Sequence, residues 1–218
     1  IHQASPSPMK HSGVLYTLLF LTLLSTASAQ TYVGLNGGGG MPDEVLFRGA
    51  LFGERSLGAN IALRVEAAYV QRENPSLLTQ LPRRRNYIQP VINYLEVPML
   101  FKFQLPLPIV DLYALAGPQI AYGIHLYSTY EEDNRIFTER LDFRRMGIHR
   151  LDVGCYVGAG LEKEISRGRR IFIDIRYYLG LHNINANGQE KIFNQGKSFA
   201  LGFMMQVKSK RTTAGLPK

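Results

Sequence analysis

The chain has 218 residues, with 21 Gly, 12 Tyr, 11 Phe and no Trp, and a formal net charge of +8 at pH 7. This length supports one domain, and the glycine and aromatic content favours β structure. Beyond the N-terminus no stretch of about 18 apolar residues occurs, which excludes membrane-spanning helices there. The basic residues come without a helix-turn-helix, zinc-finger or RNA-recognition pattern, so we expect no nucleic-acid partner. The single cysteine, Cys155, excludes an intrachain disulfide framework.

Residues 9–29 have the pattern of an export signal, and we interpret residues 1–8 as sequence upstream of the initiator Met9. Met9-Lys10-His11 is a basic start, residues 14–24 form a compact apolar run, and Ala27-Ser28-Ala29 supplies the small residues of a cleavage site. This arrangement is typical of a secretory signal peptide, and the apolar run is short for a transmembrane helix. We therefore predict a cleaved signal peptide and a mature chain that starts at Gln30.

From Gln30 onward, apolar and polar residues alternate with period two in eight segments. Such alternation predicts β-strands with two unlike faces. The predicted strands cover residues 31–39, 45–53, 59–71, 93–104, 111–127, 151–162, 170–181 and 198–207. Pro98 and Pro118 fall inside two of them, and because proline cannot donate a ladder hydrogen bond, we expect a bulge or strand end at each.

The segment 151–162 indicates which way the two faces point. One face consists of Leu151, Val153, Cys155, Val157, Ala159 and Leu161, and the other of Asp152, Gly154, Tyr156, Gly158, Gly160 and Glu162. A face that is half glycine, with two carboxylates, suits a crowded interior better than water. We therefore predict that the apolar face, Cys155 included, faces lipid, and that the glycines make room for bulky neighbours such as Arg176 and Tyr178.

The connections between the predicted strands differ in length. The longest are residues 72–92, 128–150 and 182–197, and the short ones are 40–44, 54–58, 105–110 and 166–169. If the mature chain starts on the periplasmic side, the three longest connections lie outside the cell and the tight turns inside, as is typical of outer-membrane barrels. We predict an all-β fold, an eight-stranded antiparallel up-and-down transmembrane β-barrel over residues 30–208, with a basic C-terminal tail over 209–218.

Four motifs occur in order along the mature chain. They are Tyr94-Leu95-Glu96-Val97-Pro98 with Leu100-Phe101-Lys102-Phe103, Ala116-Gly117-Pro118 after Tyr113, Gly158-Ala159-Gly160-Leu161-Glu162, and Arg176-Tyr177-Tyr178-Leu179-Gly180-Leu181-His182-Asn183-Ile184. Together they resemble the PorT-like outer-membrane β-barrel family of Bacteroidetes-type bacteria. The resemblance implies a location in the outer membrane of a Gram-negative bacterium. It also implies, as an alternative function, an accessory role in a secretion system that exports cell-surface proteins.

Charged residues fall on the faces that we predict to point inward. The set comprises Arg48, Arg64, Glu66, Glu96, Lys102, Asp152, Glu162, Asp174 and Arg176. Side chains just fill an eight-stranded barrel, and buried charges there must pair. We predict a structural salt-bridge network, with Glu96 beside Lys102 and Asp174 beside Arg176. The alternatives are a proton or ion path, or catalytic carboxylates.

Other candidate sites have weaker patterns. Arg83, Arg84 and Arg85 form a basic cluster in a predicted external loop, where they would contact lipopolysaccharide phosphates or else remain solvated. His125, His149 and His182 fall near predicted external strand ends without a metal-binding spacing. No nucleophile-elbow motif occurs. We therefore expect no catalytic residues, no cofactor and no bound metal.

The predicted function is that of a small outer-membrane barrel with a side-chain-filled lumen, in a structural or surface-interaction role and without catalysis. Besides the secretion-accessory role, a second alternative is a secreted, soluble, lipocalin-like barrel that binds a small ligand, which requires Leu, Ile and Phe to face inward. The expected partners are outer-membrane lipid, lipopolysaccharide and secretion-machinery proteins. The sequence leaves the oligomeric state open.

Overall fold

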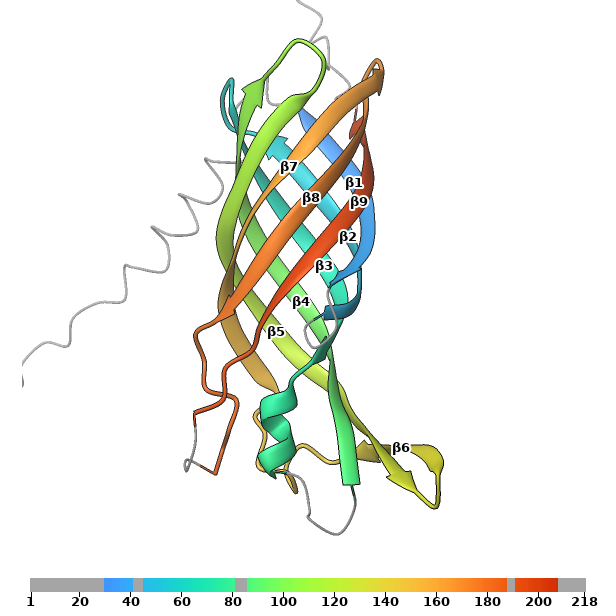
Figure 1. The fold of residues 1–218 in the computed structure, drawn as a ribbon. Coiled ribbons are helices and arrows are strands. Elements are labelled where there is room, and N and C mark those ends of the chain that lie inside the picture. The colour runs from blue at the N-terminus through green and yellow to red at the C-terminus, as the bar shows by residue number, and fades with distance from the viewer. Residues whose placement is uncertain (1–29, 41–44, 81–85, 188–190, 208–218) are drawn as a thin grey trace, which may run out of the picture.

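A computed structural model of the chain describes residues 30–40, 45–80, 86–187 and 191–207 (Figure 1). The predicted signal peptide, the basic tail and the cluster Arg83-Arg84-Arg85 lie outside the described residues. Within the described part of the chain, no helix has the length and apolar character needed to cross a membrane.

The described fold consists almost entirely of strands. The elements are β1 (Thr31–Gly40), β2 (Val45–Ser56), β3 (Ile61–Glu73), the short 3-10 helix η1 (Pro75–Gln80), β4 (Asn86–Pro106), β5 (Asp111–Glu132), β6 (Arg135–Leu141), β7 (Leu151–Ser166), β8 (Arg169–Gly180) and β9 (Gln195–Val207). Each of the eight predicted segments coincides with one of these strands. Period-two alternation therefore located the strands correctly, and only their ends differ.

Eight of the strands form a closed antiparallel barrel (Figure 1). Each barrel strand pairs with the next along the chain, with β5 followed by β7, and β1 pairs with β9 to close the ring. Along this seam Thr31 pairs with Val207 and Gly40 with Ser198. In the described residues, β6 pairs with β5 alone and lies outside the ring. The predicted eight-stranded up-and-down barrel is confirmed.

Two of the predicted connections contain more structure than the sequence indicated. β4 has 21 residues and β5 has 22, so both extend well beyond the predicted strands. β5 then turns through Asp133 and Asn134 into β6, which the sequence analysis missed. These two residues have φ angles of 50° and 61°, and the two-residue hairpin turn requires positive φ at both positions, which Asp and Asn tolerate. The resulting β5–β6 hairpin projects sideways from the barrel (Figure 1).

The expected bulges at the two strand prolines were wrong. Pro98 pairs with Gln119, Pro118 pairs with Cys155, and the β4–β5 register is the same on both sides of these residues. The register shifts of this pair lie instead between Tyr87 and Gln89 and between Asn93 and Tyr94. Regular pairing on both sides holds the strands in register, so a missing proline donor interrupts the ladder only locally.

The connections divide between the two ends of the barrel. We call the end with the short turns 57–60, 107–110 and 167–168 the turn end, and the end with the connections 74–85, 133–150 and 181–194 the loop end. The long connections therefore share one end, as predicted. The short β1–β2 connection is an exception, because Gly40 and Val45 also lie at the loop end.

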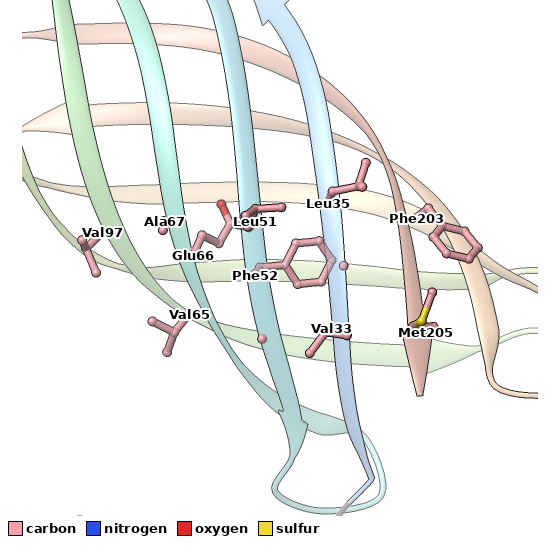
Figure 2. A pocket seen from close by; sticks show the side chains of 12 residues that line it. Val33, Leu35, Leu51, Phe52, Val65, Glu66, Ala67, Val97, Phe203 and Met205 are labelled. Carbon is pink, nitrogen blue, oxygen red and sulfur yellow. The ribbon is translucent and has the colours of Figure 1, made fainter. Parts of the chain in front are cut away.

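The outer wall of the barrel is apolar. Leu51 and Ile175 are both 67% exposed, and Val97, Phe199 and Leu201 likewise point outward. Figure 2 shows Val33, Leu35, Leu51, Val65 and Val97 around a shallow apolar hollow on the outside of the wall. The lipocalin-like alternative fails here, because it needs these side chains inside. The outward face also carries Cys155, as predicted.

Apolar packing closes the loop end of the barrel. Leu77 from η1, Phe143 and Ile148 from the β6–β7 connection, and Ile184 and Ile192 from the β8–β9 connection belong to one buried cluster. The cluster is completed by Ile92, Tyr94, Ala121 and Leu126, which are inward residues of β4 and β5, and by Leu141 of β6. We call this cluster the apolar cap. The apolar cap covers the mouth of the charged lumen at the loop end.

Candidate functional site

The barrel interior carries the largest group of chemically active side chains. Even-numbered residues of β2, β3, β7 and β8 point inward, and this parity places charges on facing walls. In the described lumen, the cations are Arg48, Arg64, Arg72, Lys102, Arg170 and Arg176, and the anions are Glu54, Glu66, Glu96, Asp152, Glu162 and Asp174. The two sets are equal in number. All but Arg170 are almost fully buried.

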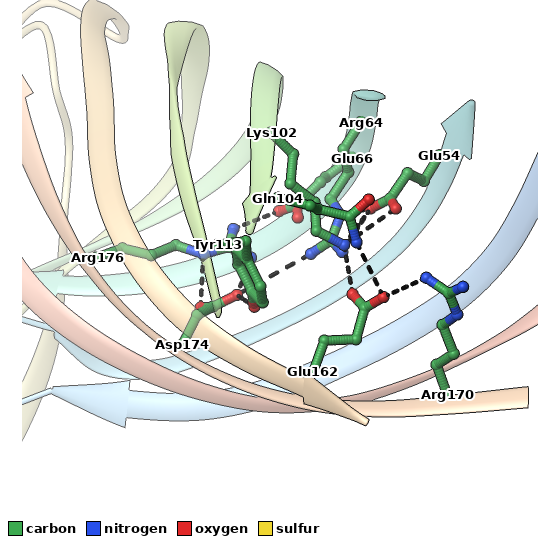
Figure 3. A network of polar contacts seen from close by, with 10 residues as sticks. All are labelled: Glu54, Arg64, Glu66, Lys102, Gln104, Tyr113, Glu162, Arg170, Asp174 and Arg176. Atoms are coloured by element: carbon green, nitrogen blue, oxygen red, sulfur yellow. Dashed lines mark hydrogen bonds and ion pairs between the residues drawn. The ribbon is translucent and has the colours of Figure 1, made fainter. Parts of the chain in front are cut away.

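Near the turn end, Glu54 and Glu162 share the surrounding cations (Figure 3). Lys102 Nζ contacts Glu162 and lies 3.1 Å from Glu54 Oε1. Arg64 Nη2 lies 2.6 Å from Glu54 Oε2, and Arg170 Nη1 lies 2.7 Å from Glu162 Oε1. Because each carboxylate has two cationic neighbours, the cost of burying their charges is offset by direct pairing.

In the middle of the barrel, Glu66 accepts from two arginines. Arg48 donates to Glu66 from the neighbouring strand β2, and Arg176 Nη1 reaches it from β8 at 2.8 Å. Arg176 also makes a bidentate pair with Asp174, through Nε at 2.8 Å and Nη2 at 2.9 Å. Tyr113 donates its hydroxyl to the same carboxylate at 2.9 Å. This cluster connects strands on opposite sides of the ring.

A second group lies toward the loop end. Arg72 donates to Glu96 Oε1 through Nε at 3.1 Å and Nη2 at 2.6 Å. Tyr156 accepts from Arg72 at 2.7 Å and donates to Glu96 Oε2 at 2.8 Å. The Arg72 guanidinium also lies over the Tyr178 ring, 3.7 Å from its centroid. A planar cation held by a carboxylate and two aromatic rings is a rigid arrangement.

Asp152 differs from the other lumenal carboxylates. Among the described residues it has no ion-pair partner within 4 Å, although it is fully buried. Its Oδ2 accepts from Asn194 Nδ2 at 2.8 Å, and Asn194 also donates to the Tyr94 hydroxyl. Asn74 donates to Asn194 Oδ1 at 2.9 Å. Asp152 is therefore held by one neutral amide, Asn194, which also bonds to Tyr94 of the apolar cap.

The structure pairs the predicted charges differently from the sequence analysis. Asp174 and Arg176 do pair, but Glu96 and Lys102 do not: Glu96 contacts Arg72, and Lys102 contacts Glu54 and Glu162. Six residues along a strand span about 20 Å, too far for a direct contact. The network also includes three residues that were not predicted: Glu54, Arg72 and Arg170. The first two continue the even-numbered inward parity of β2 and β3, which would have identified them.

The inward-facing glycines of β7 leave space for bulky neighbouring side chains, as predicted. A Cβ atom at Gly154 would meet the Tyr178 ring, and one at Gly160 would lie 2.5 Å from the Tyr113 ring. At Gly158 it would lie 3.2 Å from the Arg176 side chain. The missing side chains therefore let Tyr113, Arg176 and Tyr178 fill the lumen.

Titratable side chains also gather at the rim of the loop end. His149 and His182 lie with ring centroids 5.6 Å apart, whereas His125 packs near Tyr127. Across the described ranges, no group of three or more His, Cys, Asp or Glu residues is arranged to hold a metal ion. At Asp142, the backbone N–H of Arg145 donates to Oδ1 at 2.9 Å. This bond lowers the pKa of the Asp142 carboxyl, which is therefore ionised at neutral pH.

Comparison with known proteins identifies the family. A family model described as "Outer membrane protein beta-barrel domain" matches residues 44–186, more than half of the chain. The chain belongs to this family. Membership of this family supports the outer-membrane location, which we predicted from strands whose apolar faces point outward. The match does not distinguish the PorT-like group, so PorT-like membership and the secretion-accessory role stay predictions.

The comparison with solved structures found proteins with low sequence identity to this chain. The N-terminal barrel domain of OprF from Pseudomonas aeruginosa has 11% identity and a TM-score of 0.43, over 82% of this chain and 97% of that one. Neisserial surface protein A has 10% identity and a TM-score of 0.43, over 82% and 96%. OprG from Pseudomonas aeruginosa has 12% identity and a TM-score of 0.42, over 84% and 98%. No curated protein matches the chain.

Proposed function

We propose that the protein is a sealed outer-membrane barrel that works through its loop end, as a surface in contact with other components of the cell envelope, and not as a pore or an enzyme. The observation that carries this proposal is the burial of the described lumenal charges, of which all but Arg170 are almost fully buried. Arg48, Arg64, Arg72 and Lys102 are at most 1% exposed. A water-filled channel would leave such side chains accessible.

The sealing has two layers. The lower layer is the ion-pair network, in which removing one partner leaves an uncompensated buried charge. The upper layer is the apolar cap, where Leu77, Phe143 and Ile184 come from three different connections. Opening a path for ions would require both layers to separate. The lumen is thus better suited to rigidity than to transport.

The loop end carries a surface that extends beyond the lipid-facing wall. β4 and β5 continue past the rim, and Tyr87, Tyr130 and Phe137 align across β4, β5 and β6. The Tyr130 and Phe137 rings stack at 5.5 Å, and Tyr87 meets Tyr130 edge-on at 5.8 Å. Ile136, on the other face of β6, is 74% exposed. A three-stranded platform of this kind fits a surface-interaction role.

Conductance measurements test the sealed lumen. We expect the protein, refolded and inserted into a planar lipid bilayer, to produce no stable unitary conductance. An Arg72→Ala, Glu96→Ala double variant removes one ion pair while leaving the cap residues in place, and we expect it to stay closed as well. Regular, ohmic single-channel steps from the unaltered protein would contradict the proposal.

Thiol labelling of intact cells tests whether the loop end faces the outside. Thr138 on β6 is exposed, so a Thr138→Cys variant in a Cys155→Ala background carries one accessible thiol. We expect a membrane-impermeant maleimide to label it on intact cells. The matched control, Ser166→Cys at the exposed turn end, should react only after lysis. The reverse pattern would place the proposed working surface in the periplasm and overturn the proposal.

A further inference from the structure

A small basic hollow lies at the rim of the loop end, on the flank of the barrel. It has a volume of about 290 Å³ and is lined by His125 of β5, Arg140 of β6, and Arg150 just before β7. Asp142 and Phe143 form another side. The hollow lies outside the lumenal charge network. Residues of the apolar cap form part of its lining, beside charged side chains. It lies where β6 and the start of β7 meet β5, because the two strands pair with successive parts of β5.

The position of Arg150 is fixed by its neighbours. Its Nη1 donates to the carbonyl oxygen of Gly123 at 3.1 Å. Its guanidinium lies 4.4 Å from the Phe143 ring centroid and 6.0 Å from that of Tyr122. A guanidinium has five N–H donors, and this carbonyl uses one. The others are available to an acceptor in the hollow.

The charge balance of the hollow favours an anion. Arg140 and Arg150 both line it, and in the described part of the chain neither has an ion pair with a carboxylate. The anionic side chain at the site, Asp142, has its Oδ1 engaged by the backbone of Arg145. Arg144 lines a second hollow that shares Phe143 and Arg150 with the first. Several cations are thus concentrated at one point of the rim.

The hollow lies at the edge of the lipid-facing wall nearest the loop end. Next to the hollow, toward the turn end, Tyr122 of β5 pairs with Leu151 of β7. The two side chains point outward with exposed fractions of 52% and 46%. Tyrosine is typical of the level where acyl chains meet headgroups. A lipid whose chains pack on Tyr122 and Leu151 would therefore bring its headgroup to Arg150.

We infer that this hollow binds the phosphate group of a phosphorylated glycolipid of the outer leaflet, such as the lipid A part of lipopolysaccharide. Arg150 and Arg140 hold the phosphate oxygens, for which the guanidinium fork is well matched. The wall residues Tyr122 and Leu151 hold the acyl chains. This site is separate from the lipopolysaccharide contact predicted at Arg83, Arg84 and Arg85, which lie outside the described residues.

The inference rests on the proposed function, because it needs the loop end to face the outer leaflet. The experiment measures binding of lipid A to the detergent-solubilised protein by native mass spectrometry, with dephosphorylated lipid A as the comparison ligand. We expect phosphorylated lipid A to bind about tenfold more tightly, as hydrogen bonds to charged groups predict. We expect Arg150→Gln to abolish this preference.

Three further variants separate the phosphate site from general effects. Arg140→Glu changes an exposed side chain and should also abolish the preference without disturbing the fold. Arg145→Gln, at the same rim but outside the hollow, and Arg169→Gln, at the turn end, should change binding by less than about twofold, as isolated surface charges do. Heat-modified mobility on a gel confirms that each variant is folded.

Three outcomes would overturn the inference. Equal binding of the two forms of lipid A would exclude the phosphate contact. Full retention of the preference in folded Arg140→Glu and Arg150→Gln would exclude this hollow. Competition by inorganic phosphate at the concentration that suffices for lipid A would indicate a site for free phosphate instead of a lipid headgroup. In each case, outside labelling of Thr138→Cys would leave the proposed function intact.

Discussion

A Glu66→Gln variant should lose about 3–5 kcal/mol of unfolding free energy, the range for breaking a buried ion pair by removing one partner. Glu66 is the common acceptor of Arg48 and Arg176. Glutamine keeps the shape but leaves two buried guanidinium groups without that negative charge. The chain has no Trp, so unfolding of the protein in lipid vesicles by urea is best followed by far-UV circular dichroism.

The matched control is Asp152→Asn. Asp152 is as deeply buried as Glu66 but has an amide partner, Asn194, in place of a cation. We expect this change to cost about 1 kcal/mol or less, the net value of a neutral hydrogen bond. Equal losses for the two variants would show that ion pairing contributes little to the stability of the lumen.

An Ile175→Arg variant should destabilise the barrel in a bilayer by about 2–4 kcal/mol, the cost of an arginine on the lipid face near the midplane. Ile175 lies in the middle of β8 and points outward. The control is Ile136→Arg on β6, because Ile136 is equally exposed but belongs to the hairpin outside the ring. There we expect a change of about 0.5 kcal/mol or less, as for an ordinary surface position.

Urea unfolding in vesicles measures both variants under the same conditions. If Ile175→Arg and Ile136→Arg have the same small effect, the outward face of β8 does not meet lipid. If both are strongly destabilising, the β5–β6 hairpin itself is immersed in the membrane. The pair of variants therefore tests the position of the membrane on the molecule as well as the orientation of the faces.

The sequence predicted the barrel wall well because period two is a strong signal when one face is lipid and the other a packed lumen. It failed at the loop end. The turn at Asp133-Asn134 is a weaker hairpin signal than Asn-Gly, and β6 has exposed residues on both faces. Alternation therefore carries little information there, and the β5–β6 hairpin was interpreted as a loop.

The contacts of the lumen were harder to predict than its composition. Parity indicates that Lys102 and Glu162 both point inward, but their contact joins β4 to β7 across β5. Such pairing depends on the register of every intervening strand. The hollow at Arg150 was missed for a similar reason, since it is assembled from β5, β6 and the approach to β7. Only the folded hairpin brings Arg140 to it.

The seam between β1 and β9 has a consequence for the closure of the ring. The buried inward side chains of these strands are uncharged: Tyr32 and Asn36 on β1, and Ser198, Ala200 and Met204 on β9. The ionised groups of the network are carried by β2, β3, β4, β7 and β8. Pairing of β1 with β9, which closes the ring, therefore desolvates no charged side chain on the inward faces of these two strands.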